Sequence, residues 1–362
     1  MLDAIVREQT TILLGLSALI AVIGLLYYVY LSRLEASECS TMTSIFGDLA
    51  TGISSISPDL AEYQHSFKDF YVKSAYNCCS GGSYKNDFVS LCVLKNVLKQ
   101  GVRGLDVEVF SIGDEPIIST SVTDNFYVKQ TFNSVGFNGF MDLLTSNAFA
   151  SSTAPNYLDP VVLHVRFKST NPAMFKNMAK IFENYPNFLL GPGYSFEYHG
   201  KNLGDVPLTS LMGKVVVVAD KSNPAFLDSV DLMEYVNMCS SGPFMRALPY
   251  QAIKYAPSIV ELIEYNKLAM TIALPDNQAN PENPSPVVLR ETGCQLLAMR
   301  YSLVDENLDA ADAFFSEAGA AFVLKPEKLR YVPIEIEDPP EQNPEVSYAT
   351  RDVSSDYYQF DI

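Results

Sequence analysis

The 362-residue sequence is poor in the side chains that bind metals and polyanions. It has three histidines and six cysteines, none of them in a Cys-x-x-Cys pair, which argues against a structural zinc site and a disulfide scaffold. Only 25 Lys and Arg residues stand against 42 Asp and Glu, so the formal net charge is −17. Because nucleic acid and anionic lipid attract basic surfaces, nucleic acid is not expected as a partner, and no general attraction to anionic headgroups is expected either.

One segment lacks charge altogether. The run TILLGLSALIAVIGLLYYVYL occupies residues 11–31, after a short tail over residues 1–10. At about 1.5 Å of rise per residue, a helix of this length spans roughly 30 Å, which is one hydrocarbon core. A cleaved signal peptide is the alternative, but it would have a basic leader and a shorter apolar run. We therefore predict a single-pass membrane protein, anchored through residues 11–31, whose topology stays open.

The soluble part alternates between apolar runs and amphipathic stretches, after a polar juxtamembrane segment over residues 32–60. Apolar strands that alternate with helices, such as the one expected over residues 171–185, indicate a parallel sheet buried on both faces. We predict an irregular (β/α)8 TIM barrel. A doubly wound open sheet is the alternative, but its glycine-rich phosphate loop is missing. The candidate strands are residues 101–110, 115–120, 159–167, 213–220, 268–275, 294–302 and 320–326.

The last segment, residues 331–362, differs in composition from the rest. It contains the acidic, proline-rich stretch PIEIEDPPEQNPE and ends in YYQFDI. Such composition predicts an extended tail. The terminal YYQFDI either belongs to that solvated tail or docks onto another surface.

Several stretches resemble, in order, the X and Y boxes of eukaryotic phosphoinositide-specific phospholipases C. GVRGLDVEVF, DEPIISTSVT and PVVLHVRFKST are similar to the X half, and ETGCQLLAMRYSL and AFVLKPEKLR are similar to the Y half. The resemblance implies a phospholipase-C-like barrel over residues 61–330, with an X-like part at 61–221, a linker at 222–250 and a Y-like part at 251–330. More narrowly, AYNCC, GKNLGDVPL and RETGCQ resemble phospholipase-C-like proteins of large DNA viruses. That likeness implies a virion inner membrane or a host membrane.

The resemblance places the catalytic and substrate positions of that family on residues that do not suit them. The two histidines that act as general acid and base fall on Tyr76 and Val122, and two substrate lysines fall on Val218 and Asp220. A phenol titrates near about 10 and is a poor base at neutral pH, while valine transfers no proton. Losing one general acid or base costs on the order of 10²–10⁴-fold in rate. The sequence therefore predicts a barrel without the family's catalytic machinery.

The calcium position is altered as well. Of the ligands that the resemblance implies, Asn77, Asp106 and Glu108 remain, but the last acidic position falls on Arg166. A fixed positive charge there disfavours calcium, so no cofactor is expected. Since strand side chains alternate, His164 would share the inward face with Arg166. Two alternatives stay open: Arg166 forms an ion-pair plug, or it replaces calcium while His164 serves as a base.

The cysteines leave a choice open. Cys78 and Cys79 are adjacent, and a bridge between neighbours is strained. Either could pair with Cys92 or Cys39 in an oxidising compartment. Otherwise they are small buried hydrophobic residues near the barrel mouth.

These observations lead to a ranked set of functions. The first is a membrane-anchored, catalytically inactive phospholipase-C-like barrel that acts as a structural or interaction protein, with other virion or capsid-associated proteins as partners. The second is an active phosphoric diester hydrolase with altered, metal-independent chemistry. The third is a module that binds a lipid or headgroup without turnover.

Overall fold

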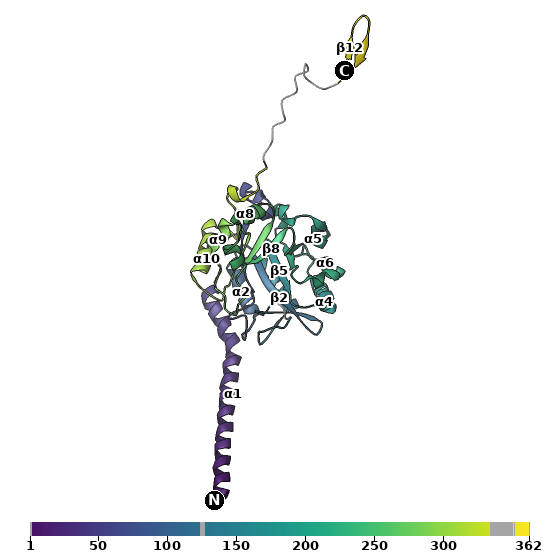
Figure 1. The fold of residues 1–362 in the computed structure, drawn as a ribbon. Coiled ribbons are helices and arrows are strands. Elements are labelled where there is room, and N and C mark those ends of the chain that lie inside the picture. The colour runs from purple at the N-terminus through teal and green to yellow at the C-terminus, as the bar shows by residue number, and fades with distance from the viewer. Residues whose placement is uncertain (1, 124–126, 334–349, 351, 362) are drawn as a thin grey trace. The chain divides into compact units, whose positions relative to one another are not determined.

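The structure is a computed structural model that describes residues 2–123, 127–333, 350 and 352–361 (Figure 1). The chain forms two compact units, Met1–Tyr331 and Val332–Ile362, which are described separately. The first contains a long helix and a barrel.

The amino-terminal helix α1 spans Leu2–Phe46. It is long and apolar enough from Ile12 onward to cross a membrane, by length and composition. The helix continues to Phe46, so the first half of the segment predicted as juxtamembrane is helical.

Eight parallel strands form a near-closed barrel. Their hydrogen-bonded order is β7-β6-β5-β2-β1-β10-β9-β8, and the two end strands are joined by residues 241–244. This confirms the predicted barrel and rules out the open doubly wound sheet. The strands are β1 (Phe70–Ala75), β2 (Gly104–Ile112), β5 (Val161–Phe167), β6 (Val215–Asp220), β7 (Met238–Ser240), β8 (Met245–Pro249), β9 (Met270–Leu274) and β10 (Leu296–Met299).

Two of the predicted strands lie outside the ring. β3 (Glu115–Ser119) runs antiparallel to β2 and pairs with β4 (Val135–Gly136), while β11 (Phe322–Leu324) runs antiparallel to β1. A continuous apolar run indicates that a strand is buried, but not whether it runs parallel or antiparallel to its neighbours. The sequence therefore could not distinguish β3 and β11 from the barrel strands. Conversely, β7 and β8 fall within the residues expected as a linker.

Helices cover the outside of the barrel, and side-chain caps fix several of their starts. Asn171 accepts a hydrogen bond from the amide of Ala173 at the start of α4, which confirms the helix predicted there. Asp305 caps α10 through the amide of Leu308. The helices are α2 (Leu91–Lys99), α3 (Phe137–Ala148), α4 (Pro172–Phe182), α5 (Ser195–Gly200), α6 (Val230–Met233), α7 (Tyr250–Lys254), α8 (Ile259–Leu268), α9 (Pro286–Glu291) and α10 (Glu306–Ala318).

Alternation along the strands separates the two sides of the barrel wall. On β5, Leu163 and Val165 join the core that packs against the covering helices, whereas Val162 belongs to the other core cluster. His164 and Arg166 lie on the same face of β5 as Val162, because side chains alternate along a strand. Their side chains therefore point into the barrel, on the mouth side of the apolar Val162.

The carboxy-terminal unit contains a small hairpin. β12 (Asp352–Ser354) pairs antiparallel with β13 (Gln359–Asp361), and the rings of Tyr358 and Phe360 lie 5.4 Å apart. The acidic, proline-rich stretch predicted as extended occupies residues 333–345, and all of it except Pro333 lies outside the described residues.

Candidate functional site: an arginine in the barrel mouth

The strand register brings the acidic and basic candidates face to face. On the paired strands β2 and β5, Asp106 lies opposite His164 and Glu108 lies opposite Arg166. Asn77 follows the end of β1, and its backbone amide donates to Oδ2 of Asp106 over 3.2 Å. All five residues therefore meet at the carboxyl ends of three neighbouring strands.

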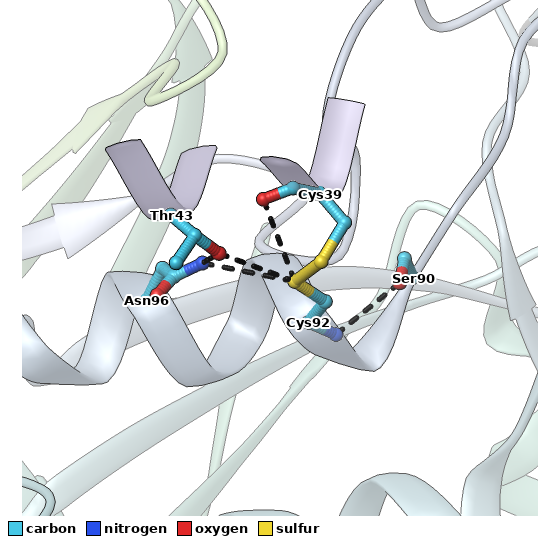
Figure 2. The surroundings of a disulfide bond; sticks show 5 residues. All are labelled: Cys39, Thr43, Ser90, Cys92 and Asn96. Carbon is cyan, nitrogen blue, oxygen red and sulfur yellow. Dashed lines mark hydrogen bonds between the residues drawn. A yellow bond between two sulfur atoms is a disulfide. The ribbon is translucent and has the colours of Figure 1, made fainter. Parts of the chain in front are cut away.

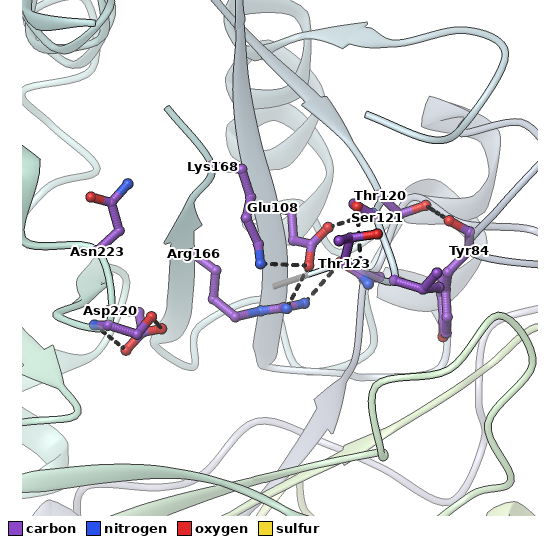
Figure 3. Close-up of polar contacts among 12 residues, drawn as sticks. Tyr84, Glu108, Thr120, Ser121, Thr123, Arg166, Lys168, Asp220 and Asn223 are labelled. Carbon is purple, nitrogen blue, oxygen red and sulfur yellow. Dashed lines mark hydrogen bonds and ion pairs between the residues drawn. The ribbon is translucent and has the colours of Figure 1, made fainter. Parts of the chain in front are cut away.

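Arg166 lies at the centre of this group. Its Nε and Nη2 donate to the two carboxylate oxygens of Asp106 over 2.9 and 2.7 Å. Its Nη1 donates to Oε1 of Glu108 over 2.7 Å, and Nη2 also reaches Oδ1 of Asn77 over 3.1 Å. Figure 3 shows Arg166 directed toward Glu108, with Lys168 beside it. Such bidentate, charge-assisted bonds are among the strongest in proteins.

A second chain of hydrogen bonds runs from Asp106 to Asp220. His164 lies 2.7 Å from Oδ1 of Asp106 through Nδ1 and 2.8 Å from the Ser240 hydroxyl through Nε2. Ser240 in turn lies 3.2 Å from Oδ1 of Asp220, which also accepts a bond from Ser241. The order Asp106–His164–Ser240 is that of a hydrolytic triad. However, His164 and Ser240 are 0% exposed, so a substrate cannot reach either of them.

The charges determine how these groups titrate. Burial raises the pKa of Asp106, but Arg166 and the hydrogen bond with His164 outweigh it, so that pKa lies well below its ordinary value. Burial dominates at Glu108 and raises its pKa despite Arg166 and Lys168. Burial lowers the pKa of Arg166, but the neighbouring carboxylates raise it further. The guanidinium therefore stays charged, and it stabilises the ionised form of Asp106 more than that of Glu108.

The positions that the resemblance assigns to catalytic histidines hold Tyr76 and Val122. Tyr76 is buried, and the Arg166 guanidinium lies 4.9 Å from the centre of its ring. Burial raises the pKa of the Tyr76 phenol, so even less of it is ionised and able to accept a proton at neutral pH. Val122 is half-buried and offers no titratable group. Val218 is fully buried beside His164 in the neighbouring strand.

The residues present do not fit a calcium ion. Calcium needs six to eight oxygen ligands, roughly, around one point. Here the oxygens of Asn77, Asp106 and Glu108 converge on the guanidinium of Arg166. Within the described residues, no three His, Cys, Asp or Glu side chains gather in a way that could hold a metal ion.

A cavity of about 380 Å³ opens above Arg166. Arg166 and Lys168 line one side, and Asp220 and Ser241 line another, together with the ring of Tyr127. Arg166 keeps 12% of its side chain exposed. Arg166 therefore lines an open cavity at the barrel mouth.

The cysteines divide into one bridge and four thiols. Cys39 of α1 is bonded to Cys92 of α2 (Figure 2). Cys78 and Cys79 are free and buried, so the alternative in which either one pairs with Cys92 or Cys39 is wrong. Burial raises the pKa of the Cys78 thiol, which disfavours a reactive thiolate.

Sequence comparison identifies a family likeness in the second half of the barrel. The sequence profile described as "Phosphatidylinositol-specific phospholipase C, Y domain" matches residues 236–328. No curated protein matches the chain.

Comparison of structures covers most of the barrel. The crystal structure of L. pealei PLC21 is similar with a TM-score of 0.59 and 19% identity, over 74% of this chain and 38% of that one. The crystal structure of S. officinalis PLC21 gives 0.57 and 18%, over 76% of this chain and 39% of that one. The chain thus spans well under half the length of these proteins. The barrel has a phospholipase-C-like fold.

Sequence reasoning missed three contributors to the site. Ser240 and Ser241 belong to β7 and the turn after it, which lacks a long apolar run and was expected as a linker. Lys168 follows β5, and its ammonium lies 3.9 Å from Oε1 of Glu108. Strand alternation past Arg166 could have identified Lys168, because both positions share one face.

Proposed function

We propose that this protein is a membrane-anchored phospholipase-C-like barrel that does not cleave phosphodiesters and acts as a structural or interaction protein. The observation that carries the proposal is the Arg166 guanidinium, which binds Asp106, Glu108 and Asn77 at once. Those oxygens are thereby committed to an internal ion pair. Neither Tyr76 nor Val122 can act as a base at neutral pH, so the two positions that the resemblance assigns to histidines offer no general base.

The apolar part of α1 would insert the protein into a membrane as a single-pass anchor. The resemblance to proteins of large DNA viruses supports a virion inner membrane or a virus-associated host membrane, with other virion proteins as partners. Immunogold labelling of purified virions and of infected-cell membranes tests this placement.

A binding role without turnover is the second candidate, and it rests on the cavity. Arg166 and Lys168 present positive charge there, and Nδ2 of the buried Asn77 lacks a hydrogen-bond partner within the described residues. An anionic group bound in the cavity would meet Arg166 and Lys168, which line it. A screen of phosphorylated headgroups by titration calorimetry tests this role, and Arg166→Ala should abolish any binding that is found.

An active hydrolase with metal-independent chemistry would need His164 as its base. His164 is enclosed between Asp106 and Ser240, so it would first have to leave both hydrogen bonds. Turnover of phosphoinositides or glycerophosphodiesters by the purified protein, measured against Tyr76→Ala and Arg166→Ala variants, decides between this alternative and the inactive barrel.

A further inference from the structure

A disulfide joins the helix α1 to the barrel close to the apolar run. Cys39 of α1 is bonded to Cys92, the second residue of α2 (Figure 2). Cys39 lies eight residues after Leu31, the end of the predicted span, which is about 12 Å of helix. The helix from Ile12 to Phe46 is the one candidate span among the described residues. The bridge and the barrel therefore lie on the same side of the membrane.

This bridge has the features of a structural disulfide. It connects residues 53 positions apart in the chain, on two helices that also contact each other through polar side chains. Asn96 of α2 donates to the Thr43 hydroxyl of α1 over 3.0 Å. Glu38 of α1 lies against Gly82, where an added side chain would collide with both Glu38 and Asp87. The bridge thus secures a contact that the fold already makes, whereas redox-active disulfides commonly lie in Cys-x-x-Cys pairs.

The four other cysteines do not compete with the bridge. They are free, and each is at most 3% exposed: Cys78, Cys79, Cys239 and Cys294. Disulfide exchange requires a thiolate that can reach the bond. Burial raises the pKa of the Cys78, Cys239 and Cys294 thiols, which disfavours the thiolate. All six cysteines belong to the described residues, so the chain offers no accessible thiol that would mispair under oxidising conditions.

The residues that flank the span leave its orientation open. Cytoplasmic flanks are enriched in Lys and Arg, but here Arg7 precedes the span and Arg33 follows it, so the two flanks balance. The bridge supplies the information that the flanks do not. Structural disulfides persist in oxidising compartments and are rare in the cytosol, where thiols are kept reduced.

We propose that the barrel lies on the oxidising side of the membrane, the lumen or the cell exterior, and that the residues before the span lie on the cytosolic side. The Cys39–Cys92 bridge then forms after the chain has entered that compartment, and it keeps α1 attached to the barrel. The inference rests on the membrane anchor proposed above, and it holds whether or not the barrel cleaves a substrate.

The sequence has no Asn-x-Ser/Thr glycosylation acceptor with a permitted middle residue, which makes a direct test possible. The full chain is synthesised in the presence of microsomes from the endoplasmic reticulum. Ser151→Asn completes an acceptor with Ser152 and Thr153, at an exposed position in the turn after α3. The matched control is Ser151→Gln, which places an amide there without an acceptor. We expect a glycosidase-sensitive gain in mass for Ser151→Asn and none for Ser151→Gln.

Counting thiols on the same protein checks the bridge. The denatured chain is treated with a maleimide that carries polyethylene glycol, so that each free thiol adds one tag. With two of the six cysteines paired, we expect four tags before reduction and six after it. Cys39→Ser should take five tags in both conditions, because it leaves Cys92 without its partner.

The outcomes separate the orientation from the anchor. Protein that resists a carbonate wash but gains no glycan at position 151 overturns the orientation and leaves the anchor intact. Protein that is washed off the microsomes overturns the anchor itself. Glycosylated protein that takes six tags before reduction overturns the bridge as the basis of the inference.

Discussion

Arg166 and Asp106 face each other from neighbouring strands and form two parallel hydrogen bonds, from Nε to Oδ1 and from Nη2 to Oδ2. Asp106 is only 1% exposed, so its charge depends on this partner. We propose that this pair occupies the position at which the resembling family holds its calcium ion.

Removing the guanidinium should destabilise the barrel strongly. Arg166→Ala leaves two buried carboxylates, Asp106 and Glu108, without their main partner, and breaking such a pair costs about 3–5 kcal/mol. The matched control is Arg246→Ala, because Arg246 bonds Glu261, whose side chain is 57% exposed. Exposed pairs contribute about 0–1 kcal/mol. Urea unfolding of both variants measures the difference, and equal losses would contradict the buried role of Arg166.

Reversing the charge at the same position should create a calcium response. Arg166→Glu would restore a third carboxylate beside Asp106 and Glu108, with Asn77 as an amide ligand. We expect millimolar calcium to raise the melting temperature of this variant and to leave the wild-type protein unchanged. Magnesium is the control ion. A calcium-dependent shift of the wild-type protein would contradict the account of the site.

The bridge between α1 and α2 should contribute measurably to stability. Disulfides of this kind stabilise by about 2–4 kcal/mol. Cys39→Ser should lower the free energy of unfolding by that amount, and reductant should then have no further effect on the variant. A wild-type protein insensitive to reductant under unfolding conditions would show that the bridge contributes nothing.

The attachment of α1 should weaken as the pH rises from 4.5 to about 9. Burial and the neighbouring Asp87 raise the pKa of Glu38 to about 9 in the folded protein, above its ordinary value of 4.5. Between those two values the folded state binds more protons than the unfolded state, so stability falls as pH rises through this window. Glu38→Gln removes this dependence. Comparing both proteins at each pH by thermal unfolding isolates Glu38 from other titrating groups, and parallel curves would contradict the assignment.

The sequence predicted the barrel and its anchor for clear physical reasons. Strand runs such as 159–167 are apolar because both faces are buried, and the run over residues 11–31 has the length and the lack of charge that a membrane span requires. Alternation also placed His164 and Arg166 on one face. Strand direction and long-range pairing were out of reach, which is why β3 and β11 were counted with the barrel strands and β7 was not.

The functional site divides in the same way into residues that could be predicted and residues that could not. For residues on long strands, the alternation of side chains predicted which face of the sheet each one lies on. Ser240, on a three-residue strand, could not, so the link from His164 to Asp220 was not foreseen. The Cys39–Cys92 bridge was also missed, because pairing depends on the packing of α1 against α2, which local sequence does not encode.

The central claim is that Arg166 has replaced the cation and that phosphodiester cleavage has been lost with the histidines. The most direct measurement is the turnover of phosphatidylinositol and of glycerophosphodiesters by the purified full chain, with and without calcium, beside Tyr76→Ala and Arg166→Ala. We predict no turnover above either variant in any condition. Turnover by the wild-type protein that either substitution removes would contradict the claim.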